Sequence, residues 1–186
     1  MFTYDSQFDI QRKDPSFWRW SAQKLARAAE FVLAPCQEQW TQIRAQGAQY
    51  IDAHPFSPDG SLYEVYYLLM GLAIENALKA ILIKTCAADD VIAIGHRLER
   101  LAAKAEVVLT DEERQHLDDL QPYINWKGRY PTPKELKDWK LSVGHDGLMR
   151  SPARLGANQD QIDRTLALYQ KLFRLGAKTA ATPSKA

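Results

Sequence analysis

Apolar residues recur at helical spacing along most of this chain. After Asp14 and Pro15 they follow every three or four positions, at Trp18, Ala22, Leu25, Ala29, Val32 and Leu33. This spacing predicts an amphipathic helix with aspartate at the N-cap and proline in the first turn. Pro35 is expected to kink or end the helix, although the same pattern resumes at Trp40. Residues 1–13 show no clear period, and we expect a loose arm there.

The segment from Ser61 to Cys86 is apolar on nearly every side. Ser61 is followed three residues later by Glu64, a pattern typical of a capping box at a helix start. A helix without a polar face is normally enclosed by other elements. We therefore predict that this segment is the central and most buried helix of the protein.

The second half of the chain predicts shorter elements. We expect a turn at residues 87–95 and a short amphipathic helix from His96 to Ala105. Thr110 and Glu113 form a second capping-box pattern, which predicts a helix reaching Ile124. A last helix begins at Asn158 or Asp160 and carries four apolar positions at helical spacing, Ile162, Leu166, Tyr169 and Leu172.

Since no segment alternates as a strand would, the sequence predicts an all-α fold. The helix lengths favour an up-and-down four-helix bundle with additional short helices. A Pro/Gly-rich loop is expected near residues 127–156, with one short helix at 135–141 inside it. We expect a single helical-bundle domain over residues 1–176 and a disordered tail over 177–186.

Composition adds limits on location. The chain has 186 residues, a formal net charge of +1 and two cysteines without metal or redox spacing. No apolar stretch near the N-terminus is typical of a secretion signal. The longest uncharged apolar run, Val65 to Ile74, is about half a membrane span. We therefore expect a cytoplasmic protein with reduced thiols and no membrane partner.

Two charged residues interrupt the central helix. Glu75 and Lys79 lie four positions apart, in the orientation that favours an ion pair along a helix. A carboxylate on so apolar a helix should be at least partly buried, and a buried charge needs a partner. The pair is therefore either a structural ion pair or the anchor of a ligand-binding polar pocket.

His96 follows Gly95 at the predicted start of a helix. A histidine in this position is either a structural group that bonds nearby backbone or a side chain that faces a pocket. Imidazole titrates near neutral pH, so His96 is the candidate general acid or base if a pocket exists.

The segment NWKGRYPTP at residues 125–133 ends a helical pattern abruptly. Gly128 permits unusual backbone angles and Pro131 restricts the residue before it, which together would present Arg129 from a fixed bend. A guanidinium there could bind carboxylate or phosphate, or could simply bond Glu75 or the end of a helix. Lys127 and Tyr130 flank it and are candidate ligand-binding residues.

The region around that bend is basic. From Trp126 to Leu155 the chain has seven cationic and three anionic side chains, interleaved with Trp126, Tyr130 and Trp139. Cations among aromatics suit phosphate and base stacking, but they also suit a solvated loop.

Several chemical signatures are absent from the sequence. It contains neither GxxxxGK[ST] nor GxGxxG, so an ordinary P-loop or Rossmann nucleotide site is excluded. It also lacks HExxH and GxSxG, and its four histidines and two cysteines show no metal-ligand spacing. We expect no metal and no cofactor.

Three motifs in order resemble the HEPN superfamily of small helical bundles. They are the central E-x-x-L-K at residues 75–79, the H-x-L-x-x-L at residues 96–101 and the W-x-G-R-Y-P at residues 126–131. The last is similar to a segment of one uncharacterised bacterial branch. The resemblance implies a four-helix bundle, often a homodimer, in a superfamily that includes RNA-cleaving toxins and antiphage ribonucleases as well as non-catalytic nucleotide- or protein-binding modules.

Ribonucleases of that superfamily carry the pattern R-x(4–6)-H on a late helix, and no histidine of this chain is preceded by an arginine at that spacing. A catalytic pair of His96 and Arg129 would have to be assembled in space.

Taken together, the three motifs and the polar residues predict a polar pocket that binds RNA, a nucleotide or another anion, with Glu75, Lys79, Lys127 and Tyr130 as ligand-binding residues. If the pocket is catalytic, its chemistry would be metal-independent RNA cleavage in a defence or toxin–antitoxin type of system. The alternative is a non-catalytic protein–protein interaction module with a structural polar cluster.

Overall fold

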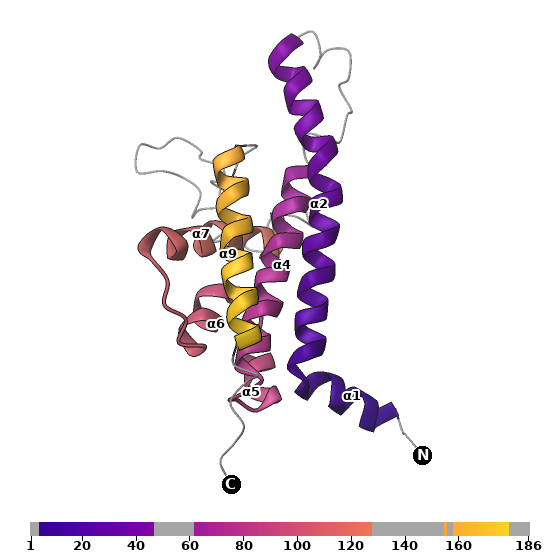
Figure 1. Ribbon diagram of the computed structural model, residues 1–186, viewed down its shortest axis with the longest axis vertical. Helices are drawn as coiled ribbons and strands as arrows, with labels where there is room; N and C mark the ends of the chain where they lie inside the picture. The colour runs from indigo at the N-terminus through magenta and orange to yellow at the C-terminus, as the bar shows by residue number, and fades with distance from the viewer. Residues whose placement is uncertain (1–3, 47–61, 128–154, 156–157, 179–186) are drawn as a thin grey trace.

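A computed structural model describes residues 4–46, 62–127, 155 and 158–178 of the chain. Every regular element within these ranges is a helix, which confirms the all-α prediction for the described residues. The elements, labelled as in Figure 1, are α1 (Tyr4–Lys13), α2 (Pro15–Gln46), α4 (Leu62–Leu82), α5 (Ala88–Ala93), α6 (Leu98–Lys104), α7 (Asp111–Pro122), the π-helix η2 (Tyr123–Lys127) and α9 (Gln159–Lys178).

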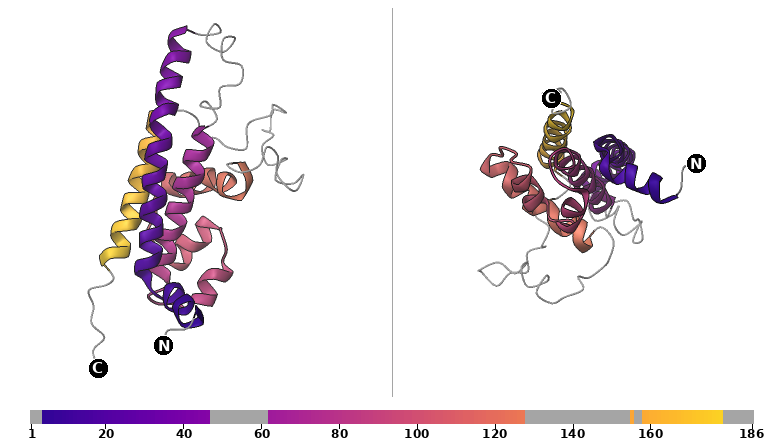
Figure 2. Two further views of the ribbon diagram at one scale, coloured as in Figure 1. Left: turned by 90° about the vertical axis from the view of Figure 1, so that its right-hand side faces the viewer. Right: turned by 90° about the horizontal axis from the view of Figure 1, so that it is seen from below.

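Three long helices lie side by side, with α4 between α2 and α9 (Figure 1). Helix α2 runs opposite to α4 and α9, whereas α7 lies across the group (Figure 2). The short helices α5 and α6 pack at the lower end of α4 in Figure 1. The up-and-down four-helix bundle is thus not confirmed, because α7 is not aligned with the three long helices.

Helix α4 is the centre of the core, as its apolar sequence predicts. Most of its residues are buried, and both interrupting charges, Glu75 and Lys79, are among them. The largest fully buried side chains of the described residues come from α4, α6, α7, η2 and α9: Tyr67, Met70, Ile74, Leu78, Leu82, Leu98, Leu101, Leu117, Leu120, Tyr123, Ile124 and Leu172.

One glycine sets how closely α4 and η2 approach. A Cβ atom added at Gly71 would lie 2.7 Å from Cγ1 of Ile124, which is too close for two carbon atoms. The isoleucine therefore fills the space above Gly71. Asn125 is the next residue of η2 after this contact.

The first long helix begins as predicted and runs through its proline. The carboxylate of Asp14 accepts a hydrogen bond from the backbone N–H of Ser16 at 2.8 Å, so Asp14 caps α2. Pro35 lies inside α2, which continues to Gln46. Helical structure thus survives the loss of one backbone hydrogen bond at Pro35.

The expected loose arm at residues 1–13 was wrong, since residues 4–13 form α1. This helix makes contacts with residues outside its own segment. The indole N–H of Trp18 donates to the carbonyl of Arg12 at 3.0 Å, and Arg12 forms an ion pair with Asp89 on α5. Neither contact belongs to the local pattern of residues 1–13.

Two other predicted boundaries need correction. The expected turn at residues 87–95 contains helix α5, and residues 177 and 178, which were expected in the tail, still belong to α9. The predicted capping box of Thr110 and Glu113 is confirmed in both directions, at 3.2 and 2.9 Å. Of the two starts predicted for the last helix, Asn158 is the one that caps α9, because its side-chain oxygen accepts a hydrogen bond from the backbone N–H of Asp160 at 2.9 Å. Ser61 and the short helix expected at residues 135–141 lie outside the described residues, as does most of the loop expected near 127–156.

Within the described part of the chain, α4 is the one helix that by length and composition could cross a membrane. Of its most apolar window, 72% is buried inside the protein. The central helix of a folded domain meets the same test, so this finding is weak evidence for a membrane span.

Candidate functional site

The site begins with a buried ion pair on α4. Glu75 and Lys79 are 3% and 6% exposed, and the Lys79 ammonium donates to Oε1 of Glu75 at 2.6 Å. The same ammonium lies 5.4 Å from the centre of the Trp18 ring on α2. Both predicted charges are therefore held inside the protein, where an aromatic face offers the cation a second favourable contact.

The second oxygen of Glu75 binds His96. Oε2 of Glu75 lies 2.8 Å from Nδ1 of His96, across 21 positions of sequence. Because an ionised carboxylate only accepts hydrogen bonds, Nδ1 must carry the proton and donate. The opposite nitrogen, Nε2, is then the atom that can accept a proton or a hydrogen bond. The His96 side chain is 58% exposed, so one end of the imidazole is anchored and the rest meets solvent.

Gln121 of α7 fixes the backbone that carries His96. Its amide N–H donates to the His96 carbonyl at 2.8 Å, and its amide oxygen accepts from the backbone N–H of Leu98 at 2.9 Å. Since Arg97 gives α6 no side-chain cap, Gln121 supplies the missing acceptor from another helix. Gly95 has a φ of 70°, which turns the chain from α5 towards α6.

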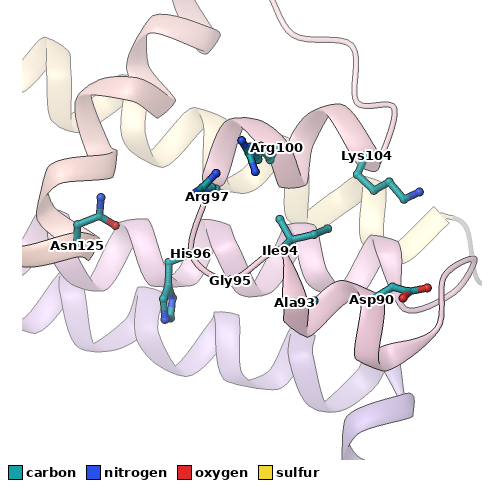
Figure 3. A pocket seen from close by; sticks show the side chains of 9 residues that line it. All are labelled: Asp90, Ala93, Ile94, Gly95, His96, Arg97, Arg100, Lys104 and Asn125. Carbon is teal, nitrogen blue, oxygen red and sulfur yellow. The ribbon is translucent and has the colours of Figure 1, made fainter.

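An open pocket of about 890 Å³ lies beside this segment. Asn125 and His96 lie towards one end and Asp90 and Lys104 towards the other (Figure 3). The remaining lining comes from the end of α5 and from α6: Ala93, Ile94, Gly95, Arg97 and Arg100.

The charge of this pocket is positive. Arg97, Arg100 and Lys104 are exposed, and within the described ranges none of them has an ion-pair partner. Asp90 is the single carboxylate among the described residues that line the pocket. The spacing of three and four residues places the cations on one side of α6. We call Arg97, Arg100 and Lys104 the α6 cations.

The predicted site residues divide into three groups. His96 lines the pocket, whereas Glu75 and Lys79 lie buried behind it and are not among its lining residues. Lys127 ends η2, and nothing is described of its side chain. Arg129 and Tyr130 lie outside the described residues.

The residues missed from sequence are Gln121, Asn125 and the α6 cations. The charged positions of residues 97–104 were visible as a run at helical spacing in the sequence. Gln121 offered no signal, because its role depends on how α7 crosses α6.

A second histidine forms a different kind of pair. Nε2 of His116 lies 2.7 Å from the Thr165 hydroxyl, which itself donates to the Gln161 carbonyl. The hydroxyl must therefore accept from the imidazole. His116 is 7% exposed, and burial holds its pKa below the ordinary value. A cavity of about 130 Å³ next to it is lined by Glu112, Glu113 and Arg164 among others.

The described residues contain no group of three His, Cys, Asp or Glu side chains that could hold a metal ion. The arrangement around His96 can therefore offer a positioned imidazole nitrogen, three cations and an amide side chain to an anionic ligand. Comparisons with protein-family models, curated proteins and solved structures gave no match to this chain.

Proposed function

We propose that the pocket beside His96 binds a phosphate-bearing ligand, RNA or a nucleotide. The observation that carries this proposal is the set of α6 cations, which line an open pocket and have no ion-pair partner among the described residues. Phosphate oxygens are strong hydrogen-bond acceptors, and arginine offers several donors to them at once. Asn125 and the outward nitrogen of His96 add neutral groups able to bind ribose or base edges.

We also propose that the chain is HEPN-like. Support comes from the contact between two of the three motifs, because the Glu75 of E-x-x-L-K directly binds the His96 of H-x-L-x-x-L. The four-helix arrangement that the resemblance implies belongs to this proposal, with α2, α4 and α9 aligned and α7 as a fourth helix that crosses them (Figure 2). A cytoplasmic location belongs to it as well.

RNA cleavage is the chemical extension of this proposal. A neutral His96 whose Nδ1–H is held by Glu75 has Nε2 free to take the proton of a ribose 2′-hydroxyl. The 2′-oxygen would then attack the adjacent phosphorus to form a 2′,3′-cyclic phosphate, and the P–O5′ bond to the next nucleotide would break. The leaving 5′-oxygen would take up a proton from water, and the proton on His96 would return to solvent. Arg129 would stabilise the charge that develops on the phosphate.

One observation favours the alternative of a non-catalytic interaction module. Both oxygens of Glu75 are already engaged, by Lys79 and by His96, and the carboxylate does not line the pocket. The cluster could therefore serve the fold alone. In that case His96 would not contribute to any chemistry, although the α6 cations would still face solvent.

Binding of a fluorescently labelled single-stranded oligouridylate tests the proposal. If three phosphates are neutralised, the logarithm of the binding constant should fall with the logarithm of salt with a slope of about −2. The triple variant Arg97→Gln, Arg100→Gln, Lys104→Gln should lose this binding. Unlabelled uridine monophosphate as competitor distinguishes a single-nucleotide site from a site for a longer strand.

A matched control removes the same charge elsewhere. Lys24, Arg114 and Arg174 are exposed on α2, α7 and α9, and their replacement by Gln should leave most of the affinity intact. Equal binding by the two triple variants would refute the proposed site. For the chemistry, His96→Gln and Arg129→Gln are incubated with the same RNA, and cleavage by wild type alone is the expected result. Binding without cleavage by wild type would leave a binding module.

A further inference from the structure

The long helix α2 carries a row of exposed residues on the side away from α4. The row follows alternating steps of four and three positions: Trp20, Lys24, Arg27, Phe31, Ala34, Glu38, Thr41 and Ala45. All eight are exposed, with Trp20 at 57% and Phe31 at 72%. We call these eight residues the outer row. Figure 2 shows α2 in front of α4 in its left view, at the outside of the protein.

Local contacts cover the two aromatic rings only partly. The Lys24 ammonium lies 3.6 Å from the centre of the Trp20 ring, and the Arg27 guanidinium lies 5.5 Å from that of Phe31. Such exposed contacts are worth about 0.5–1 kcal/mol. They leave Phe31 as the most exposed aromatic side chain among the described residues.

We propose that the outer row is an interface between two copies of this chain, packed antiparallel about a two-fold axis between Phe31 and Ala34. Steps of four and three positions are the spacing of a coiled-coil seam. A symmetric dimer requires a surface that is complementary to itself. Reversal about this axis places every member of the outer row opposite another member.

The sizes of the opposed side chains fit this register. Phe31 meets the small Ala34 of the second copy, and Trp20 meets the small Ala45. The two-fold axis repeats each contact, so both exposed aromatic rings of the outer row face alanine. Alternation of large and small side chains across facing positions favours close packing of two helices.

The charges of the outer row fit the same register. Arg27 meets Glu38 of the second copy, and the symmetry forms this ion pair twice. Lys24 meets the neutral Thr41, so no cation faces another cation. Two ion pairs that flank a packed centre are the arrangement that fixes register and orientation between paired helices.

Other arrangements of the same row are less favourable. Parallel helices in register would place Arg27 against Arg27 and Glu38 against Glu38. An antiparallel pair centred between Lys24 and Arg27 would bring those two cations together. Like charges in direct opposition are destabilising, so the charges select the axis between Phe31 and Ala34.

The groups proposed to pair across the interface are available for it. Glu38 has no ion-pair partner among the described residues, and it lies eleven positions from Arg27, about 16 Å along the helix. Arg27 cannot reach it within one chain. Arg27 contacts Glu30 at 3.4 Å, but both side chains are more than half exposed, and such a pair contributes little.

This inference goes beyond the proposed function, because the outer row lies on α2 whereas the pocket is built from α5, α6 and η2. Sedimentation velocity over a dilution series of the full chain tests it. Wild type should show a reversible dimer. Arg27→Glu and Glu38→Arg each oppose two pairs of like charge and should weaken the dimer by roughly tenfold or more. The double variant restores opposite charges and should regain the wild-type dissociation constant.

Two controls make the outcome decisive. Arg174→Glu changes an exposed charge on α9 and should leave the dimer unchanged, and circular dichroism should show equal helix content in all variants. Wild type that remains monomeric at every concentration overturns the proposal. If the dimer survives both single charge reversals, the outer row is not the interface. If the double variant does not regain the wild-type dissociation constant, Arg27 does not pair with Glu38 of the second copy.

Discussion

The two histidines that the fold anchors, His96 and His116, differ in what holds them and in what remains free. At the pocket, a buried carboxylate binds one nitrogen of His96 and leaves the side chain 58% exposed. Between α7 and α9, the Thr165 hydroxyl binds His116, which is 7% exposed. The first imidazole presents an atom to solvent, whereas the second joins two helices.

The difference shows where a polar side chain can act on a ligand. Burial favours the neutral form of His116 by lowering its pKa, and its hydrogen bond serves the packing of α7 on α9. At His96 the buried group is not the imidazole itself but the Glu75 carboxylate that binds it, so the imidazole is positioned without being enclosed. An anchored but accessible group is the arrangement expected of a binding or catalytic side chain.

The largest expected effect comes from removing one member of the buried pair. Lys79→Met keeps the length of the side chain but removes the ammonium from the Glu75 carboxylate, which keeps its hydrogen bond with His96 among the described residues. We expect a loss of about 3–5 kcal/mol in the free energy of unfolding, towards the lower end because His96 stays in place. Urea denaturation monitored by circular dichroism measures it.

The matched control is Lys24→Met, which removes an exposed lysine and its contact with the Trp20 ring and should change stability by no more than about 1 kcal/mol. Replacing both partners, with Glu75→Leu and Lys79→Met together, should cost less than Lys79→Met alone, since no charge is stranded. If Lys79→Met were as mild as its surface control, the pocket region would not depend on a buried charge pair.

Parts of both regions followed directly from the sequence because their determinants are local. The capping box at Thr110, the cap at Asp14 and the apolar faces of α4 each lie within a few residues of the element they define. The Glu75–Lys79 pair was predictable for the same reason, since it spans one helical turn.

The remaining features depend on which helices meet. Helix α1 contacts Trp18 and Asp89, and α6 is capped from α7 by Gln121. The contact of Glu75 with His96 joins two residues that the sequence singled out separately, but their proximity follows from the packing of α6 against α4. The hydrophobic periodicity of one helix does not show which other helix it packs against.

A smaller loss of unfolding free energy is expected where α4 and η2 pack closely beside the pocket. In Gly71→Ala the new Cβ would lie 2.7 Å from Ile124 Cγ1, so the isoleucine or η2 must shift. Overpacking of this kind costs about 1–3 kcal/mol. Because Asn125 follows Ile124, affinity for the labelled oligouridylate should also fall, in contrast to changes on the α9 side.

Gly176→Ala on α9 is the matched control, because the nearest atom to its added Cβ lies at an ordinary 3.7 Å. That variant should be neutral or slightly stabilising, since alanine favours a helix over glycine by about 1 kcal/mol. Equal unfolding free energies for the two alanine variants would contradict the close approach of α4 and η2.

The smallest effect is expected in the pH dependence of stability, and it separates the two histidines. Because burial lowers the pKa of His116, the unfolded chain binds its proton more readily than the folded chain does. The stabilising contribution is therefore complete above about pH 6.5, the ordinary value for histidine, and is lost as the pH falls below it. One such group changes the unfolding free energy by at most about 1.4 kcal/mol per pH unit.

The variant His116→Gln tests this contribution. An amide N–H of the glutamine can still donate to Thr165, so the hydrogen bond is kept while the titrating group is removed. Urea unfolding from pH 8 to pH 5 should then show an unfolding free energy that changes less with pH than in wild type. A wild-type slope that the glutamine variant retains in full would mean that His116 takes up its proton within the folded protein, and the contrast between an enclosed and an accessible imidazole would then be lost.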